Sequence, residues 1–230
     1  MKKRKKTTNK NRGLITILNP KSPISEQYRT VRTNIQFSAV DDSVHTLIVT
    51  STGPGEGKST TVANLAVVMA QQGKKVLLID SDMRKPTVHY TFQLPNTIGL
   101  TNVLTKQISF VDAIRETEIL DLFVLTSGPI PPNPAELLAS KSMADLIEMA
   151  KEQFDLILFD APPILAVTDA QILANLCDAS LFVLSSGKTD REEAMKAVEM
   201  LKAAKGKLLG TVLNGRKEVK SSYYYYYGHN

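Results

Sequence analysis

The stretch HTLIVTSTGPGEGKST, residues 45–60, joins an apolar segment to a glycine-rich turn and then to the start of a helix. The segment 45–51 is short and is rich in apolar and β-branched residues, which is typical of a strand buried on both faces. In the turn, three glycines allow backbone N–H groups to converge on phosphate oxygens, and the helix amino-terminus adds its positive dipole end. This strand–turn–helix context predicts a phosphate-binding loop of the Walker A type.

The residues of the loop have expected parts in nucleotide binding. Lys58 would reach the β- and γ-phosphates, and the Ser59 hydroxyl would bind Mg²⁺. One position departs from the usual pattern, because Thr52 stands where the first glycine of such loops normally lies. The residues expected to bind the nucleotide here are Gly53, Pro54, Gly55, Glu56, Gly57, Lys58, Ser59 and Thr60.

Apolar strands alternate with helices along most of the chain. Strands that are apolar throughout predict a doubly wound α/β fold, with a mostly parallel sheet and helices on both faces. Such a fold binds ligands outside the carboxyl ends of its strands. The predicted strands are 45–51, 75–80, 121–126, 155–160, 179–185 and 207–214, and the predicted helices are 22–37, 58–72, 100–104, 111–115, 133–154, 168–176 and 191–205.

Two of the predicted helices begin with capping signals. Ser22 followed by Pro23 is typical of an N-cap with proline at the first helical position. Asn133, Pro134 and Glu136 predict an N-cap, a first-turn proline and a capping box for the long helix 133–154.

Acidic residues close two of the predicted strands. Asp80 and Asp82 lie on the same side at the end of strand 75–80, because strand side chains alternate. Asp160 ends the apolar run 155–160, which is typical of a Walker B strand whose aspartate holds magnesium. Since Mg²⁺ prefers one or two carboxylates together with phosphates and waters, we expect Asp80, Asp82 and Asp160 to meet Lys58 and Ser59 at one nucleotide-metal site.

Charge is unevenly distributed along the chain. The 230 residues carry 28 Lys and Arg against 23 Asp and Glu, and seven of the cations fall in residues 1–12, which contain no acid. The rest of the chain is therefore close to neutral, which argues against a specific nucleic-acid partner. The single cysteine, Cys177, excludes a disulfide framework within the chain. No signal peptide or membrane span is predicted, so we expect a cytoplasmic protein.

These motifs together resemble those of the bacterial tyrosine kinases of capsular and exopolysaccharide assembly. The resemblance includes the phosphate loop, the D-x-D-x-R pattern that begins at Asp80, the Walker B strand, the segment TSGPIPPNP (residues 126–134) and the run Tyr223–Tyr227. Within this family the chain is most similar to the cytoplasmic Gram-positive form, in which the kinase and its membrane activator are separate chains. It implies a phosphate-loop NTPase fold of the deviant Walker, MinD-like type.

The resemblance also implies a reaction, the transfer of the γ-phosphoryl group of ATP to tyrosine, with Mg²⁺ as cofactor. Lys58, Asp80 and Asp82 are then the catalytic candidates, with Asp80 acting either as general base or as the holder of a metal-bound water. The magnesium ligands that the resemblance implies are Ser59, Asp82 and Asp160. The implied domains are a flexible basic arm at 1–20, the kinase domain at 21–215 and a flexible tyrosine-rich tail at 216–230.

The tail is the expected substrate. A run of five tyrosines without periodicity, flanked by Ser, Lys and Gly, would serve badly as core. The expected phosphorylation sites are Tyr223, Tyr224, Tyr225, Tyr226 and Tyr227. The implied partners are a membrane-bound polysaccharide co-polymerase, which would activate the kinase and recruit it to the inner face of the membrane, and a cognate tyrosine phosphatase.

Two further features have both a functional and a purely structural interpretation. Glu26, Arg29 and Arg32 form one stripe of the first helix, either a solvated face with a local ion pair or, as in the resembled family, the contact between subunits of a ring. Asn214, at the end of the last strand, either contacts the nucleotide or opens a turn with Gly215.

Three other functions are alternatives to the kinase. Partition or division-site ATPases share the nucleotide motifs but typically place a second lysine early in the loop, where this chain has Gly53. A small-molecule kinase would need a lid with clustered arginines, which the sequence lacks. A nucleotide-gated scaffold for polysaccharide export would bind nucleotide without forming phosphotyrosine.

Overall fold

The computed structural model describes residues 13–38 and 44–216. Their centre is a seven-stranded sheet in the order β3-β4-β2-β5-β1-β6-β7, in which every pair is parallel except β3 with β4. The predicted parallel sheet is therefore confirmed, together with its alternation of strands and helices. The strands are β1 (Thr46–Ser51), β2 (Val76–Asp80), β3 (Arg115–Glu116), β4 (Leu122–Leu125), β5 (Leu156–Asp160), β6 (Ala179–Ser185) and β7 (Lys207–Asn214).

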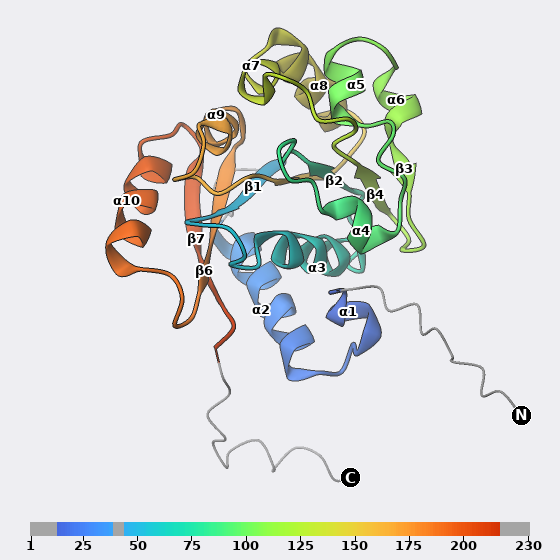
Figure 1. Cartoon of the computed structure of the whole chain (residues 1–230). Helices are drawn as coiled ribbons and strands as arrows, with labels where there is room; N and C mark the ends of the chain where they lie inside the picture. Colours follow the sequence, from blue (N-terminus) through green and yellow to red (C-terminus); the bar gives the residue numbers. More distant parts are fainter. Residues whose placement is uncertain (1–12, 39–43, 217–230) are drawn as a thin grey trace, which may run out of the picture.

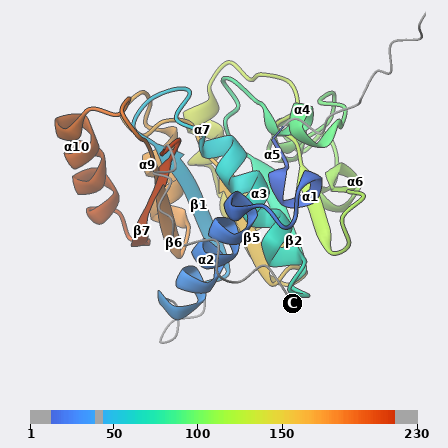
Figure 2. The ribbon, with the colours of Figure 1, turned by 90° about the horizontal axis from the view of Figure 1, so that it is seen from below.

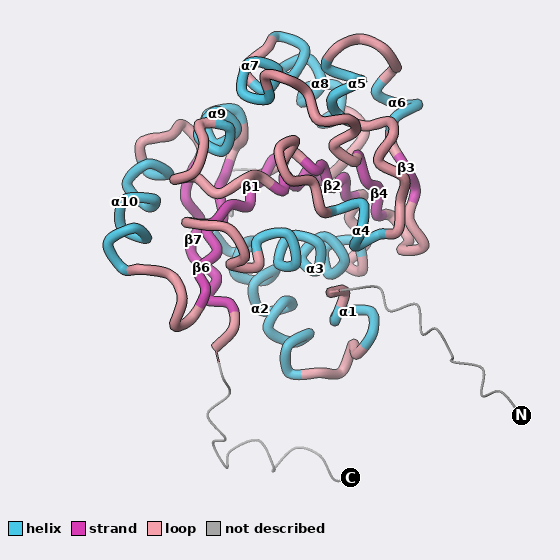
Figure 3. Tube along the Cα trace, in the orientation of Figure 1, coloured by secondary structure: helices cyan, strands magenta, loops and turns pink. Residues whose placement is uncertain are grey.

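Helices cover both faces of this sheet (Figure 1). One face carries α1 (Ile15–Leu18), α2 (Pro23–Ser38) and α3 (Lys58–Ala70), which lie side by side in Figure 2. The helices of the opposite face are α5 (Leu100–Leu104), α6 (Phe110–Ala113), α7 (Pro134–Leu138), α8 (Lys141–Lys151), α9 (Asp169–Leu176) and α10 (Arg191–Lys202). The short helix α4 (Val88–Phe92) lies in the long connection that follows β2, most of which is loop in Figure 3.

Each face of the sheet has its own apolar core. The core beneath α3 takes the side chains of Leu47, Val49 and Leu78, and the core on the other face takes those of Ile48, Leu77 and Ile79. This alternation along β1 and β2 buries every residue of both strands, as the unbroken apolar runs predicted. No helix in the described part of the chain is long and apolar enough to cross a membrane.

The prediction of a flexible basic arm at residues 1–20 is wrong for residues 14–18. Leu14 is buried beside α3, and α1 follows directly, so residues 14–18 belong to the folded domain rather than to a flexible arm ending near residue 20. The Asn64 side chain fixes this segment, because its Oδ1 accepts hydrogen bonds from both the backbone N–H and the hydroxyl of Thr16. Residues 1–12 lie outside the described residues.

The long helix predicted at 133–154 is two helices, α7 and α8, joined at Ser140. The Ser140 hydroxyl donates to the carbonyl of Leu137 and accepts the N–H of Met143, so one side chain closes the first helix and caps the second. The capping box at Asn133 is also wrong, because its side chain makes no cap hydrogen bond and its amide donates instead to the Glu136 carboxylate. At Ser22 the cap is confirmed, since its hydroxyl accepts the N–H of Ser25.

A further correction concerns the edge of the sheet. The helix predicted at 111–115 lies at Phe110–Ala113, and Arg115 belongs instead to β3, which pairs antiparallel with β4. A strand of two residues carries too little alternation to be read from the sequence. Its existence depends on the backbone of β4 lying alongside it.

Candidate functional site

The loop between β1 and α3 has the conformation that its glycines predict. Gly57, the residue before α3, has φ of 95°, a left-handed value that favours glycine. A Cβ at this position would collide with the side-chain amide of Asn214. That amide donates to the carbonyl oxygen of Glu56 at 3.0 Å. Asn214 thus supports the loop from the end of β7, and its contact with a nucleotide remains a prediction.

Lys58 lies between two carboxylates that come from different strand ends. Its Nζ is 3.0 Å from Oδ2 of Asp82 and 3.2 Å from Oδ1 of Asp160, and it also contacts the Ser59 hydroxyl at 3.3 Å. The sheet brings these groups together because β2 and β5 are neighbours, with Asp80 and Asp160 paired in register. The four charged residues that the sequence assigned to one site therefore lie together at the carboxyl edge of the sheet.

Asp80 is fully buried at the end of β2. Its Oδ2 accepts the N–H groups of Thr87 and Val88, both at 3.0 Å, whereas its Oδ1 has no partner among the described residues. Burial raises the pKa of Asp80 to about 8, and the neighbouring Asp160 adds to this effect. The carboxyl is thus held by the loop beyond β2 while one oxygen stays available.

Burial and their mutual contact act in opposite directions on the ionisation of Lys58 and Asp160. Burial alone would lower the pKa of Lys58, but the carboxylates of Asp160 and Asp82 raise it, so the amine stays protonated. Burial raises the pKa of Asp160, and Lys58 offsets only part of this shift. The Lys58 ammonium is therefore a main contribution that favours the ionised form of Asp160.

The acidic groups fit a magnesium ion that is completed by other ligands. Asp160 Oδ2 and Asp80 Oδ1 are both buried acceptors without a hydrogen-bond partner in the described part of the chain. No group of three or more His, Cys, Asp or Glu side chains among these residues could hold a metal alone. Mg²⁺ commonly binds one or two carboxylates and fills its remaining positions with phosphate oxygens and waters.

The structure adds an ion pair to the D-x-D-x-R segment that the sequence did not predict. Arg84 binds both carboxylate oxygens of Asp169, with its Nε 2.9 Å from Oδ2 and its Nη2 3.0 Å from Oδ1. Asp169 is completely buried at the start of α9, and this bidentate contact raises the pKa of Arg84. Nothing in the local sequence around Asp169 marks it as a partner, because the contact spans 85 residues.

A second group of contacts braces the phosphate loop from the segment after β6. Glu56 accepts the N–H of Gly53 within the loop, and its other oxygen accepts the hydroxyl of Thr189. Lys188 donates to the carbonyl oxygens of Pro54 and Gly55. The sequence points to Lys188 and Thr189 only through their position, since both follow the carboxyl end of a predicted strand.

The predicted interface stripe has partners within its own chain. Arg29 pairs with Glu26 and donates to the carbonyl of Pro20, and Arg32 donates to the carbonyl of Val68 in α3. Glu26 remains mostly exposed, and the Nε of Arg32 is buried without a described partner. The local ion pair of the structural interpretation is therefore present, while the contact between subunits stays a prediction. The tyrosines of the run Tyr223–Tyr227 lie outside the described residues.

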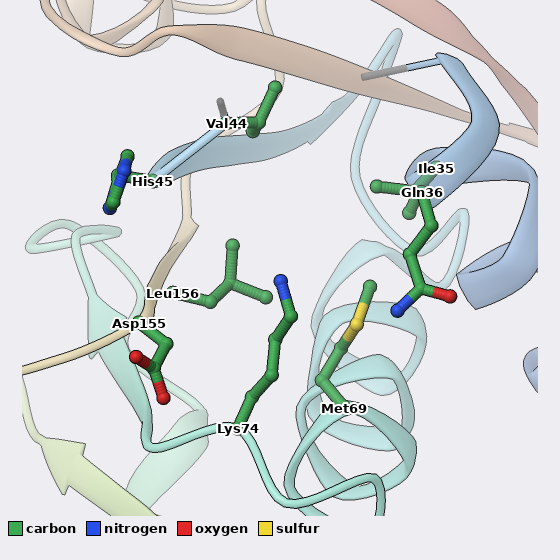
Figure 4. Close-up of a pocket in the computed structure, with 8 residues that line it drawn as sticks. All are labelled: Ile35, Gln36, Val44, His45, Met69, Lys74, Asp155 and Leu156. Carbon is green, nitrogen blue, oxygen red and sulfur yellow. The ribbon is translucent and has the colours of Figure 1, made fainter. Parts of the chain in front are cut away.

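The opposite edge of the sheet has a cavity of a different kind (Figure 4). It encloses about 600 Å³ at the amino ends of β1, β2 and β5, with an apolar floor that includes Met69 and Leu156. His45, Lys74 and Asp155 surround it, and none of them belongs to the predicted nucleotide site. This cavity lies at the far end of the strands from the phosphate loop.

A parallel sheet with a phosphate loop after β1, acids after β2 and β5, and helices on both faces defines the phosphate-loop NTPase class. The AAA domain family matches residues 44–202 of this chain. The septum site-determining protein MinD of Pyrococcus horikoshii, solved with Mg-ADP, superposes with a TM-score of 0.65 at 25% identity, over 76% of this chain and 72% of that one. The predicted MinD-like fold is confirmed.

More similar proteins place the chain within this class. Tyrosine-protein kinase YwqD of Bacillus subtilis is 59% identical over 94% of this chain and 92% of its own length. The crystal structure of the chimerical protein CapA2B2 has a TM-score of 0.87 and 46% identity, over 90% of this chain and 91% of that one. The chain belongs to the family of bacterial tyrosine-protein kinases, which confirms the resemblance seen in its motifs.

Proposed function

We propose that the chain is an ATP-dependent protein-tyrosine kinase that uses Mg²⁺ and phosphorylates its own tyrosines, Tyr223–Tyr227, between subunits. The observation that carries this proposal is Lys58, held between Asp82 and Asp160 beside two unpartnered carboxylate oxygens. The tyrosine-protein kinases among its relatives support it over a division-site ATPase, as does Gly53 at the position where such ATPases have a lysine.

In the proposed step the phenol oxygen of a tyrosine attacks the γ-phosphorus of ATP. The new O–P bond forms phosphotyrosine while the bond to the β–γ bridging oxygen breaks and ADP leaves. The phenol, whose ordinary pKa is near ~10, gives its proton to a base. Asp80 is the candidate, since its raised pKa makes its carboxylate a stronger base than an exposed aspartate. Its alternative role is to hold a metal-bound water.

Nucleotide binding would rearrange the contacts of Lys58. The amine would exchange Asp82 and Asp160 for β- and γ-phosphate oxygens, as the lysine of a phosphate loop does. Asp82, Asp160 and Ser59 would then be free to hold the metal. Mg²⁺ supplies charge neutralisation on the phosphates when it is bound.

The wider function we propose is the regulation of capsular or exopolysaccharide synthesis and export. CapB of Staphylococcus aureus, a relative 46% identical over 91% of this chain, is named a putative tyrosine-protein kinase. We propose a cytoplasmic protein that a membrane-bound polysaccharide co-polymerase activates and recruits to the membrane, and that a tyrosine phosphatase resets. The unphosphorylated form would assemble into a ring through Glu26, Arg29 and Arg32.

The first experiment is incubation of the full chain with ATP and magnesium, followed by mapping of phosphosites by mass spectrometry. We expect phosphate on the tyrosine run, and more of it when the cytoplasmic segment of a polysaccharide co-polymerase is added. ATP hydrolysis without any phosphotyrosine, with and without that segment, would overturn the kinase and favour the nucleotide-gated scaffold.

Transfer between subunits is tested by mixing. A Lys58→Met subunit of distinguishable mass should acquire phosphotyrosine beside active subunits, because tethering in a ring raises the local tail concentration to about the millimolar range. An unmodified tail on the inactive subunit would refute transfer between chains. Light scattering should show a larger oligomer before phosphorylation than after it, and Arg29→Ala with Arg32→Ala should weaken both assembly and tail phosphorylation.

A further inference from the structure

Lys188 reaches the phosphate loop from a distant part of the chain. It lies in the turn between β6 and α10, and its Nζ is 2.9 Å from the carbonyl oxygen of Pro54 and 3.1 Å from that of Gly55. The turn holds it there, because the N–H groups of Lys188 and Thr189 both donate to the carbonyl of Ser185. The same turn sends the Thr189 hydroxyl to Glu56. Two successive side chains thus bind one loop.

The two carbonyls define which backbone N–H groups the lysine can orient. The carbonyl of Pro54 shares its peptide unit with the N–H of Gly55, and the carbonyl of Gly55 shares its unit with the N–H of Glu56. The described chain has no cis peptide bond, and in a planar trans unit the N–H points away from the C=O. An ammonium that binds the oxygens therefore turns these two N–H groups toward the opposite side. Backbone N–H groups of this loop are the ones that cradle phosphates.

The conformation of the backbone at Gly55 is one that the hydrogen bonds from Lys188 would stabilise. Its φ is 72°, and a Cβ there would lie 3.0 Å from the Nζ of Lys188, so the ammonium packs directly against this residue. A left-handed glycine has many alternative conformations, and each would rotate the peptide units away from the phosphates. A charge-assisted hydrogen bond to each flanking carbonyl restricts this freedom.

We infer that Lys188 is a positioning residue of the phosphate loop, which orients the N–H groups of Gly55 and Glu56 for the phosphates of the nucleotide. This inference rests on the proposed binding of ATP. Lys188 acts from the carbonyl side of the loop and is exposed to solvent, so its removal leaves the core intact. Its effect should fall on nucleotide affinity rather than on the chemical step.

The test measures equilibrium binding of fluorescent ATP and ADP analogues to the full chain with magnesium, together with KM for ATP and kcat. Lys188→Ala should weaken binding about five- to tenfold, on the order expected for a lost charge-assisted contact, and raise KM equally with kcat within about twofold. Lys188→Arg should restore affinity to within about twofold. Lys188→Gln, which keeps a donor but no charge, should fall between them.

The control is Lys196→Ala, which removes an equal charge from the exposed side of the adjacent helix α10. It should bind nucleotide as the unmodified chain does. Wild-type affinity in Lys188→Ala, equal losses in Lys188→Arg and Lys188→Ala, or a fall in kcat without a change in affinity would each overturn the inference. If the unmodified chain itself binds no ATP, the proposed function fails instead, so the two failures are distinguishable.

Discussion

The two edges of the central sheet use aspartate in opposite ways. At the amino edge, Asp155 accepts the N–H of Lys75 at 2.7 Å, and one oxygen of Asp178 accepts the N–H groups of His45 and Thr46. Both side chains reach solvent. At the carboxyl edge, Asp80 and Asp160 are completely buried, and each keeps one oxygen without a partner in the described part of the chain.

This difference separates carboxylates that satisfy backbone N–H groups from carboxylates that keep an open acceptor. A carboxylate at the amino edge satisfies backbone N–H groups that would otherwise lack partners, and water solvates what remains of its charge. Burying an acid with an open acceptor costs free energy, and such acids cluster at functional sites. Under the proposed function, the same residue type thus stabilises one edge and would bind a cation beside phosphates at the other.

Removal of the lysine at the carboxyl edge should have the largest effect. Lys58→Met should lower tyrosine phosphorylation at least about 100-fold, because the cation facing the transferred phosphate is lost. Phosphotyrosine formation with radiolabelled ATP measures this. Lys74 lines the amino-edge cavity in Figure 4. Lys74→Met is the matched control and should keep nearly full activity. Equal losses in the two variants would break the comparison.

The next largest effect should come from Asp80→Asn. If Asp80 accepts the phenol proton, kcat should fall about 100-fold while the magnesium dependence stays unchanged. A higher magnesium requirement in this variant would instead assign Asp80 to the metal-bound water. Steady-state kinetics at several magnesium concentrations separates the two roles. Activity equal to that of the unmodified chain would remove Asp80 from the site.

The pH dependence of stability should distinguish the edges without any substrate. Burial raises the pKa of Asp80 to about 8, whereas an unfolded chain releases this proton near ~4. Between these values the folded state holds a proton that the unfolded state has lost, so the stability contribution is complete at low pH and declines as pH rises toward 8. The slope approaches about 1.4 kcal/mol per pH unit at most.

Urea denaturation between pH 5 and 8 measures this slope. The free energy of unfolding of the unmodified chain should fall relative to that of Asp80→Asn as pH rises. Asp155→Asn provides the same chemical substitution at the amino edge. Parallel stability curves for the unmodified chain and Asp80→Asn would show that the carboxyl at β2 ionises as it does in the unfolded chain.

The smallest effect should come from the amino edge itself. Asp155→Ala removes the acceptor of the Lys75 N–H, an exposed contact, and should lower the free energy of unfolding by about 1 kcal/mol. Kinase activity should stay unchanged, because the site lies at the other end of the strands. A loss of phosphorylation that exceeds the loss of stability would show that the two edges are coupled.

Local patterns in the sequence predict the six parallel strands and most of the helices of the fold. Apolar runs identified the six strands of the parallel sheet, because a strand covered on both faces has no polar alternation. The predicted boundaries are wrong where a tertiary or capping contact, rather than a local pattern, ends a helix or begins the folded domain. Ser140 divides a helix through hydrogen bonds to both halves, and Leu14 joins the core although the residues before it are strongly basic.

The phosphate loop and the acids that close β2 and β5 can be recognised from the sequence alone, because strand–glycine–helix order and an apolar run ending in Asp are local features. Which of these groups meet depends on the folded chain. Register between β2 and β5 places Asp80 beside Asp160, Lys58 spans the acids, and Arg84 finds Asp169 85 residues away. Lys188 could not be assigned from its neighbours, because its contact with Pro54 and Gly55 exists only after β6 pairs with β1. Pairing between distant strands obeys no local period, so these contacts appear only when the sheet has formed.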